Sequence, residues 1–363
     1  LPHPDSEVRG VYIATVTNIN YPSKPGLSVD EQRAELDDIV KTTKEANLNA
    51  IYFQVRPASD ALYKSSIFPT SEYLTGKQGA EIEFDPLGYL VKTAHANGIK
   101  VHAWVNPYRI TTGSASKPKT DPNLLAENNP ARLHPEYTVA YADGRLYYNP
   151  GLPEVRALIA DGVREIAQNY AVDGIIFDDY FYPYPVASAE FNDADAFAKY
   201  GNGRDLADWR RSNVNAMIEA CYDAIKSVRE DCQFGVAPGG IWQNDDGKNG
   251  GSATAGFESY KSLYCDPTAW VEGGYVDYLA PQIYWRFSTK VARYDVLVRW
   301  WNTLLDGTDV DLLISHGVYN YDTWDSPSGE LRNQIGFARS EVAYKGSLLY
   351  GYAALKSNSE GLF

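Results

Sequence analysis

The fold of this 363-residue chain is decided by the stretch Val172-Asp-Gly-Ile-Ile-Phe-Asp-Asp-Tyr180. Its apolar centre predicts a strand over Gly174–Asp178 that is buried on both faces. Helical patterns of hydrophobic residues precede and follow this strand. A buried strand between two helices is typical of a parallel sheet, and the polar residues that end such a strand lie at one edge of the sheet.

Seven further runs have the same character. They are rich in Val, Ile, Tyr and Phe, and several are almost continuously apolar, as strands buried on both faces should be. The seven predicted strands are Val8–Val16, Ala50–Arg56, Lys100–Asn106, Gln233–Ala237, Tyr278–Tyr284, Leu312–Val318 and Ser347–Tyr352.

Helices with recognisable ends lie between these strands. Ser28-Val-Asp-Glu31 is a capping box that starts the first helix, and Asp85-Pro86 supplies the N-cap and first residue of the second. Further helices are predicted from about Pro153, over a segment that carries Val214 to Val228, and near Asp266–Glu272, Val291–Leu305 and Gly329–Ala343.

Eight alternations of strand and helix predict an α/β fold, a (β/α)8 TIM barrel, formed as a single domain over residues 1–363. The loops that follow the strands ending at Asn106, Asp178 and Ala237 are long, whereas the helix-to-strand connections are short. Barrel enzymes carry their sites on the face with these strand-to-helix loops. A doubly wound sheet is disfavoured because no Gly-rich turn follows the first strand. Little chain follows the eighth strand, which is consistent with a further C-terminal extension.

The composition disfavours several classes of protein. With 33 Lys and Arg against 47 Asp and Glu, the formal charge of −14 does not suit a nucleic-acid partner. There is no apolar run of about 18 residues, so we expect no transmembrane segment in this chain. Three cysteines without a CxxC spacing and only five histidines argue against a disulfide framework or a metal site, and no cofactor is predicted. The chain begins at Leu1 rather than Met, which is consistent with a removed leader and an extracytoplasmic location.

Polar and aromatic residues gather at the predicted C-terminal ends of the strands. Such a mixture suits a carbohydrate, because sugar hydroxyls need directional partners and sugar ring faces stack on aromatic rings. We therefore predict a polysaccharide or glycan-strand substrate. The candidate substrate-binding residues are Arg56, Asn106, Tyr108, Arg109, Tyr180, Trp242, Gln282, Tyr284, Trp285 and His316.

Asp178 and Asp179, at the end of the fourth strand, are the first candidates for catalysis. Glycosidic cleavage needs one carboxyl as acid and a second group as nucleophile, base or charge stabiliser, and adjacent buried carboxyls raise the pKa of one of the pair. Neighbouring residues of a strand point to opposite faces, so we expect Asp178 to enter the barrel and Asp179 to face the loop. Glu154 is a third catalytic candidate, with stabilisation of the first helical turn as its alternative role.

Five segments together resemble the glycosyl-hydrolase-like-10 family, over a span from about Glu7 to Tyr352. The YngK-like members of this family are exported bacterial proteins, and the best understood are peptidoglycan glycosidases that act on glycan strands stripped of peptides. The resemblance implies a barrel glycosidase, often a secreted protein or a lipoprotein, that cuts a bacterial cell-wall glycan between amino sugars. The five segments are Arg9-Gly-Val-Tyr-Ile-Ala-Thr-Val16, Phe53-Gln-Val-Arg-Pro57, Val101-His-Ala-Trp-Val-Asn-Pro-Tyr-Arg109, Val172-Asp-Gly-Ile-Ile-Phe-Asp-Asp-Tyr-Phe-Tyr182 and Leu279-Ala-Pro-Gln-Ile-Tyr-Trp285.

The fourth-strand segment also resembles two other groups of barrels. Against the DxxDxDxE signature of chitinase-type barrels, Asp173 and Asp178 keep acidic positions, whereas Tyr180 stands where the catalytic Glu would be. α-Amylase-type barrels end a similar segment with a nucleophilic Asp, which corresponds to Asp178. The partner acid stays open among several carboxyls of the loop face: Glu154, Glu190, Asp193, Glu258 and Asp266.

Three functions follow from these observations. The first is a glycoside hydrolase in which Asp178 acts as nucleophile or stabiliser, or orients a substrate acetamide that is itself the nucleophile. The second is a barrel that binds glycans without cleaving them, because Tyr180 replaces an acid. The third, a metal-dependent hydrolase, is disfavoured by the scarcity of histidine.

Overall fold

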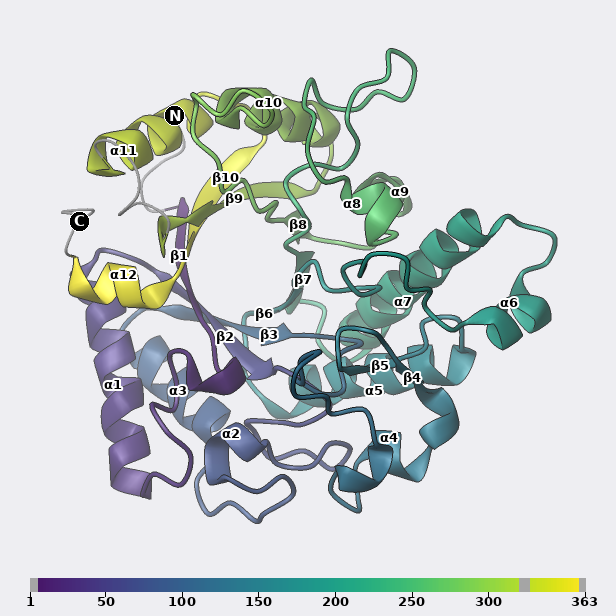
Figure 1. Cartoon of the computed structure of the whole chain (residues 1–363). Coiled ribbons are helices and arrows are strands. Elements are labelled where there is room, and N and C mark those ends of the chain that lie inside the picture. The colour runs from purple at the N-terminus through teal and green to yellow at the C-terminus, as the bar shows by residue number, and fades with distance from the viewer. Residues whose placement is uncertain (1–5, 320–326, 359–363) are drawn as a thin grey trace.

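The computed structural model describes residues 6–319 and 327–358 and forms a closed barrel of eight parallel strands surrounded by helices (Figure 1). The order around the ring is β1-β10-β9-β8-β7-β6-β3-β2, so the first and last strands close it. The predicted (β/α)8 fold and its eight strands are confirmed, although β8 is much shorter than expected. The strands are β1 (Val8–Ile13), β2 (Ala50–Arg56), β3 (Lys100–Val105), β6 (Gly174–Phe177), β7 (Gln233–Val236), β8 (Tyr278–Leu279), β9 (Asp311–Gly317) and β10 (Tyr344–Tyr350).

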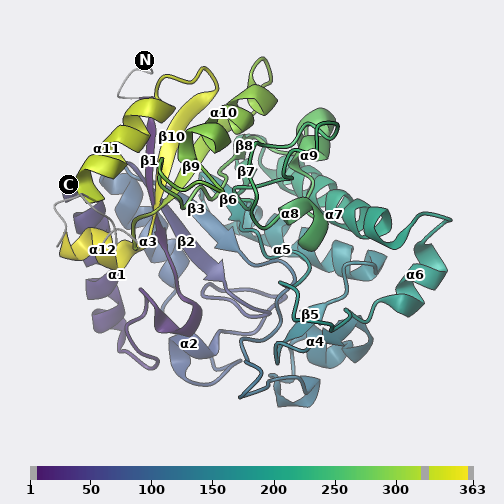
Figure 2. The same cartoon turned by 45° about the horizontal axis from the view of Figure 1, so that its top comes forward.

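Helices cover the outside of this ring (Figures 1 and 2). The predicted helix starts are confirmed, since Ser28 and Glu31 form the reciprocal capping box and the side chain of Asp85 accepts the backbone N–H of Gly88. A short eighth helix, α12, follows β10, where the sequence left little room for one. The main helices are α1 (Val29–Glu45), α3 (Pro86–Ala96), α5 (Pro153–Asn169), α7 (Leu206–Val228), α9 (Pro267–Gly273), α10 (Tyr294–Leu305), α11 (Pro327–Ala338) and α12 (Tyr352–Ser357).

The long loops after the strands carry small elements of their own. An antiparallel hairpin, in which Thr138 pairs with Tyr148, lies in the loop between β3 and α5 and was not predicted. These additions lie on the strand-to-helix face of the barrel, as the loop lengths indicated. The small elements are η1 (Val16–Asn18), α2 (Glu72–Thr75), η2 (Pro122–Leu124), α4 (Pro130–Leu133), η3 (Pro135–Tyr137), β4 (Thr138–Ala140), β5 (Leu146–Tyr148), α6 (Ala194–Tyr200) and α8 (Ser259–Ser262).

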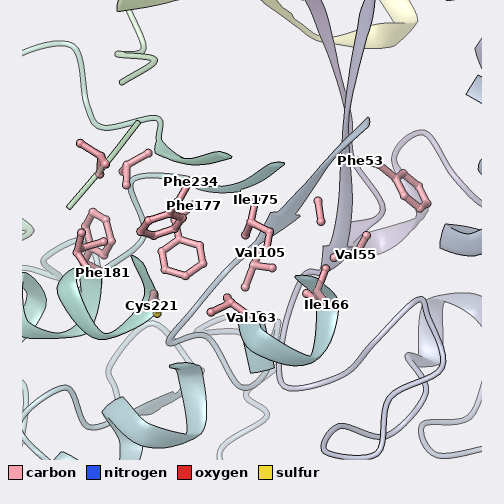
Figure 3. Packing of buried hydrophobic residues seen from close by; sticks show 14 of the residues in the cluster. Phe53, Val55, Val105, Val163, Ile166, Ile175, Phe177, Phe181, Cys221 and Phe234 are labelled. Carbon is pink, nitrogen blue, oxygen red and sulfur yellow. The ribbon is translucent and has the colours of Figure 1, made fainter. Parts of the chain in front are cut away.

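The alternation of side chains along the strands divides the core into an outer and an inner part. Outward-facing residues pack against the helices: Figure 3 shows Val105 and Ile175 from two strands close to Val163 of α5. Inward-facing residues form a separate cluster in the barrel lumen. Because the period of a strand is two, these two sets interleave in sequence. The lumen cluster is Tyr12, Ala14, Ala50, Tyr52, Trp104, Ile176, Ala237, Tyr278, Ala280, Leu313 and Leu348.

Large rings fill the middle of the lumen, and glycines on adjacent strands make room for them. A Cβ on Gly174 would lie 2.4 Å from Nδ1 of His102, and one on Gly235 would lie 2.2 Å from the Tyr278 ring. His102 stacks on Tyr52 with ring centroids 4.6 Å apart and bonds the Tyr278 hydroxyl at 2.9 Å. Burial lowers the pKa of His102 to about 4, so this ring is neutral. The packed rings close the barrel below its loop face.

Candidate active site

A cavity of about 590 Å³ lies where the barrel strands end. Tyr12 and Trp104 belong both to the lumen cluster and to the cavity wall, so the packed lumen forms the base of the cavity. The rest of the wall comes from residues that follow β1, β6, β7, β8, β9 and β10. The polar and aromatic residues that line it are Tyr12, Asn20, Trp104, Asp178, Asp179, Tyr180, Tyr184, Gln282, Tyr284, Tyr319, Tyr350 and Tyr352.

The Asp178 carboxyl is held at this base by three N–H donors. Trp104 Nε1 and Asn106 Nδ2 both donate to Oδ2, at 3.0 and 2.5 Å. The backbone N–H of Tyr180 donates to Oδ1 at 3.1 Å. Only 7% of Asp178 is exposed, so these donors take the place of water around the carboxyl.

A chain of hydrogen bonds fixes the orientation of Asn106. The backbone N–H groups of Thr15 and Val16 donate to Gln54 Oε1 at 2.9 and 3.0 Å. Gln54 must therefore present its Nε2 to Asn106 Oδ1, at 2.7 Å, which leaves Asn106 Nδ2 to donate to Asp178. Because backbone N–H groups can only donate, the two N–H groups after β1 set the direction of every hydrogen bond in this series.

Asp179 also reaches the cavity, contrary to the expectation that it would face away. β6 ends at Phe177, so the two carboxyls lie in the loop after the strand and the alternation of a strand no longer applies to them. Gln282 Nε2 bonds Asp179 Oδ1 at 3.0 Å and also donates to the carbonyl of Ala237 at 2.9 Å. The hydroxyl of Tyr184 contacts Asp179 Oδ2.

Burial dominates the electrostatics of this pair. Burial, with the negative charge of Asp179 as the second cause, raises the pKa of Asp178 to about 6. Burial likewise raises the pKa of Asp179, against the hydrogen bonds from Tyr184 and Gln282. The Arg109 guanidinium lowers both pKa values from nearby and lies 5.2 Å from the Tyr180 ring centroid. The site therefore holds a proton up to about pH 6, well above the usual range of an aspartate.

Aromatic rings stand on two sides of the carboxyl pair. Tyr284 and Tyr350 are parallel within 4°, with centroids 6.3 Å apart, and Tyr319 stands edge-on to both. On the other side Tyr184 stacks on Phe257, with centroids 5.2 Å apart. Tyr184, Tyr319 and Phe257 are 41%, 49% and 45% exposed, so both sides present apolar ring surface to a ligand.

Arg56 and Tyr108 lie outside the cavity, contrary to their predicted role. The register between β2 and β3 shifts after Gln54, so Arg56 pairs with outward-facing Val105 and passes to the outside of the barrel. There its guanidinium packs 4.1 Å from the Phe68 ring centroid. Tyr108 is also fully buried, and its nearest ionisable neighbours include Cys221 of α7. Both side chains are part of the packing between strands and helices.

His316 and Trp285 are likewise turned away from the cavity. His316 shares the outward face of β9 with Ile314 and bonds Gln334 at 3.1 Å and Ser347 at 3.0 Å. Burial lowers its pKa to about 4. Trp285 packs partly buried against the outer core, and its carbonyl accepts a hydrogen bond from Gln334. The alternation of side chains along a strand could have excluded His316, because its neighbour Ser315 faces the lumen, where it bonds Tyr12.

Trp242 and Glu154 also lie apart from the carboxyl pair. Trp242 stacks on Trp300 at 5.4 Å and lines a second cavity of about 600 Å³ between the loop after β7 and helices α9 and α10. That cavity is as large as the first but is lined by neither Asp178 nor Asp179, so the first is the candidate active site. Glu154 is exposed in the first turn of α5, the position that favours a negative charge beside a helix N-terminus. The structure therefore does not bring Glu154 to the cavity.

Seven of the polar and aromatic residues that line the cavity were absent from the predicted set: Tyr12, Asn20, Trp104, Tyr184, Tyr319, Tyr350 and Tyr352. The strand period could have found Trp104, which precedes Asn106 by two residues on the same face. It could also have found Tyr350, which shares a face with Leu348. Tyr184 and Tyr319 lie in loops, where no periodicity in the sequence marks their direction.

The described residues include neither a metal-binding cluster nor a membrane-spanning helix. No group of three or more His, Cys, Asp or Glu side chains that could hold a metal ion is found in residues 6–319 and 327–358. Within the same ranges no helix has both the length and the apolar character needed to cross a membrane. The three cysteines, Cys221, Cys232 and Cys265, are buried and unpaired with one another.

Comparisons with known proteins agree on the kind of barrel. A family model described as Glycosyl hydrolase-like 10 matches residues 7–325. The chain is 40% identical over 366 residues to "Glycosyl hydrolase YngK" of Bacillus subtilis (strain 168), covering 99% of the chain and 70% of that relative. It is 37% identical over 362 residues to "Glycosyl hydrolase DigH" of Escherichia coli (strain K12), covering 94% and 82%. The PgaB (BpsB) glycoside hydrolase domain from Bordetella bronchiseptica superposes with a TM-score of 0.57 at 12% identity, over 98% of this chain and 96% of that one, which shows a shared fold.

The family model and the relatives make this chain a protein of the glycoside hydrolase type, and its eight-stranded barrel holds a buried carboxyl pair in an aromatic cavity. The chain belongs to the Glycosyl hydrolase-like 10 family, because the family model covers most of it and two curated relatives align over nearly all of it. The family resemblance found in the sequence is therefore confirmed.

Proposed function

We propose that this chain cleaves glycosidic bonds in a bacterial cell-wall glycan, namely peptidoglycan strands without peptides or a related amino-sugar polysaccharide. The observation that supports this most directly is the pair Asp178 and Asp179 in the cavity, with a pKa near 6 for the first. Hydrolysis of a glycosidic bond needs a carboxyl that can carry a proton and a second that can carry a charge. In this proposal Asp178 is one of the two.

The surroundings of the pair support a sugar as the ligand. Tyr284, Tyr350 and Tyr319 on one side and Tyr184 with Phe257 on the other offer ring faces to the apolar faces of sugars. Gln282 and Asn20 provide directional hydrogen-bonding groups in the same wall. Of the residues predicted to bind substrate, Tyr180, Gln282 and Tyr284 line this wall. Asn106 instead donates a hydrogen bond to Asp178, and the charge of Arg109 lowers the pKa of both carboxyls.

The choice of a peptide-free wall glycan comes from the resemblance to denuded-glycan hydrolases of peptidoglycan. The position of the carboxyls favours it, because Asp178 and Asp179 are 7% and 4% exposed and a bare strand reaches such groups more easily than one with peptide stems. A substrate of this kind implies that the chain works outside the cytoplasm, as a secreted, periplasmic or lipid-anchored protein.

Digestion of purified glycan strands tests this proposal. Strands with and without peptide stems would be incubated with the wild type, Asp178→Asn and Asp143→Asn, and the products read by mass spectrometry. Asp143 is a matched control, because like Asp178 it accepts a backbone N–H and a side-chain donor, but it lies in the hairpin between β4 and β5. We expect cleavage of peptide-free strands by the wild type and Asp143→Asn, and loss of at least about a hundredfold in Asp178→Asn.

A barrel that binds glycans without cutting them is the competing function. It is favoured by one observation, that Tyr180 occupies the place of an acid in the chitinase-type signature. Strand binding by the wild type at micromolar concentration, with no new chain ends after prolonged incubation, would establish this function instead. If the wild type neither cleaved nor bound wall strands, the proposed substrate would be contradicted.

A further inference from the structure

The two carboxyls of the site differ in the kind of partner that each one has. We propose that Asp179 is the general acid and base, and that Asp178 stays a carboxylate that orients the 2-acetamido group of the substrate, whose own oxygen is the nucleophile. This assignment rests on the proposed function and specifies the chemistry of the same site.

Every group that contacts Asp178 is an obligate donor. Trp104 Nε1 and the backbone N–H of Tyr180 cannot accept a hydrogen bond, and the chain through Gln54 fixes Asn106 as a donor too. A carboxylate has about four acceptor positions, of which three are filled here. Hydrogen bonds of this kind favour the charged form. One acceptor position, on Oδ1, remains for an N–H of the substrate.

Asp179 has one partner that can reverse its role. Gln282 Nε2 is held as a donor by its second bond to the carbonyl of Ala237. The Tyr184 hydroxyl at Oδ2 can donate to a carboxylate or accept from a carboxylic acid. A proton on Oδ2 of Asp179 therefore breaks no hydrogen bond, whereas a proton on Oδ2 of Asp178 would displace one of its two N–H donors. A proton on Oδ1 of Asp178 would take the one position that is left for the substrate.

Below about pH 6 the pair holds one proton, and these partners decide where it lies. Burial and the charge of Asp179 raise the pKa of Asp178 to about 6, which taken alone would put the proton on Asp178. We give the donors more weight, because three fixed N–H groups remain in place in either state, while the tyrosine hydroxyl can turn. The two residues then differ in charge although they are adjacent in sequence.

The position of the pair points to a nucleophile from the substrate. Retaining enzymes with a protein nucleophile place two carboxyls on opposite sides of the scissile bond, about 5–5.5 Å apart, and inverting enzymes place them further apart. Here both carboxyls start from neighbouring residues of one loop, and among the described residues the cavity wall includes no third carboxyl. A 2-acetamido sugar can supply the missing group, as substrate-assisted glycosidases do.

The reaction that follows is balanced. The acetamide oxygen forms a bond to the anomeric carbon while the glycosidic C–O bond breaks, and the leaving oxygen takes the proton of Asp179. Asp178 accepts a hydrogen bond from the acetamide N–H and offsets the positive charge that develops on the resulting oxazoline ring. Water, deprotonated by Asp179, then attacks the anomeric carbon and opens the ring, which restores the acetamide and the acid and retains the anomeric configuration.

Leaving-group dependence separates the two roles. The substrates would be peptide-free glycan strands and an N-acetylglucosamine disaccharide with a 2,4-dinitrophenolate leaving group, which needs no proton to depart. We expect Asp179→Asn to lose about 10²–10⁴-fold in kcat/KM on glycan strands, because their leaving group needs a proton. On the aryl glycoside, the rate of phenolate release should fall by less than about tenfold. Asp178→Asn should lose activity on both substrates. Asp143→Asn serves again as the control.

Two further readouts keep the assignment testable apart from the function. An aryl glycoside with a trifluoroacetamido group should react more than about tenfold slower than its acetamido counterpart, because fluorine weakens the nucleophilic oxygen. At about pH 5 the infrared C=O band of a buried carboxylic acid should persist in Asp178→Asn and vanish in Asp179→Asn. The assignment would be overturned by the opposite band pattern, or by equal rates for the acetamido and trifluoroacetamido glycosides. In either case, strand cleavage by the wild type would still support the proposed function. A wild type that cleaves nothing would contradict the function, and the infrared band would still locate the proton.

Discussion

Replacing Asp178 by asparagine is expected to stabilise the fold at alkaline pH while it removes activity. The carboxyl is 7% exposed, and burial together with the charge of Asp179 raises the pKa at which the pair loses its last proton to about 6, from an ordinary value of 3.8. A shift of this size corresponds to about 3 kcal/mol of unfavourable free energy once the group is ionised in the folded chain. Asparagine carries no charge and avoids this cost.

The pH dependence of the effect has a definite sign. Between about pH 4 and pH 6 the folded chain binds more protons at this site than the unfolded chain, so the stability of the wild type falls as the pH rises through that window. Below about pH 4 the penalty is absent, and above about pH 6 it is complete. The advantage of Asp178→Asn should therefore be full at pH 8 and small at pH 4.

Asparagine does not satisfy all the donors, which reduces the gain. Its oxygen can accept from Trp104 and Asn106, but its NH2 group then faces the N–H of Tyr180, which loses a partner at a cost of about 1 kcal/mol. About 2 kcal/mol remains. Unfolding 363 residues has an entropy of about 760 cal/mol/K, so this gain raises the Tm by about 2–3 °C.

Scanning calorimetry of the wild type and Asp178→Asn at pH 8 and pH 4 measures this difference. Asp173→Asn is the matched control, because Asp173 lies at the opposite end of the same strand and directly precedes β6. Its carboxyl accepts the N–H of Val101 and contacts His95, both at 2.8 Å. That control should lose stability at pH 8. An unchanged or lower Tm for Asp178→Asn at pH 8, or an equal gain at pH 4, would refute the reasoning.

Three further substitutions test the site and its surroundings. Tyr184→Phe removes a hydroxyl that lowers the pKa of Asp179, so the alkaline limb of the kcat/KM profile should move to higher pH. Gly162→Ala places a Cβ in α5 at 2.3 Å from Arg56 Nη1 and should lower the free energy of unfolding in urea by about 1–3 kcal/mol. His316→Phe removes the buried hydrogen bonds to Gln334 and Ser347, so it should cost about 1–3 kcal/mol of stability and leave KM unchanged.

Each of these expectations has an outcome that contradicts it. A downward shift of the alkaline limb in Tyr184→Phe would mean that its hydroxyl stabilises the acid rather than the carboxylate. Gly336→Ala is the control for Gly162→Ala, because it lies in α11 with nothing within 4 Å of a new Cβ and should add about 0.5–1 kcal/mol. A raised KM in His316→Phe would show that this ring acts on the ligand after all.

The barrel could be predicted because its determinants are local. Apolar runs such as Gly174–Phe177 can be buried only as strands, and helix starts such as Ser28 and Asp85 depend on side chains within four residues of the backbone groups that they cap. The position of the site at the strand ends followed from the same alternation. The motifs around Asp178 then identified the family.

Which residues line the site could not be predicted, because this depends on the direction in which each side chain points. A register shift after Gln54 carried Arg56 out of the barrel, and the end of β6 at Phe177 let Asp179 into the cavity beside Asp178. Tyr184 and Tyr319 entered it from loops. These directions are set by pairing between strands far apart in sequence and by packing across the barrel mouth.

The sequence by itself thus determined the fold, the family and the strand end at which the carboxyls lie, because hydrophobic period and capping act over a few residues. Only the tertiary structure decided which side chains meet in the cavity. Backbone N–H groups of Thr15 and Val16 orient Asp178 through Gln54 and Asn106, and Gln282 and Tyr184 hold Asp179. Those contacts join five separate segments of the chain, and no local pattern encodes a bond between residues that only the closed barrel brings together.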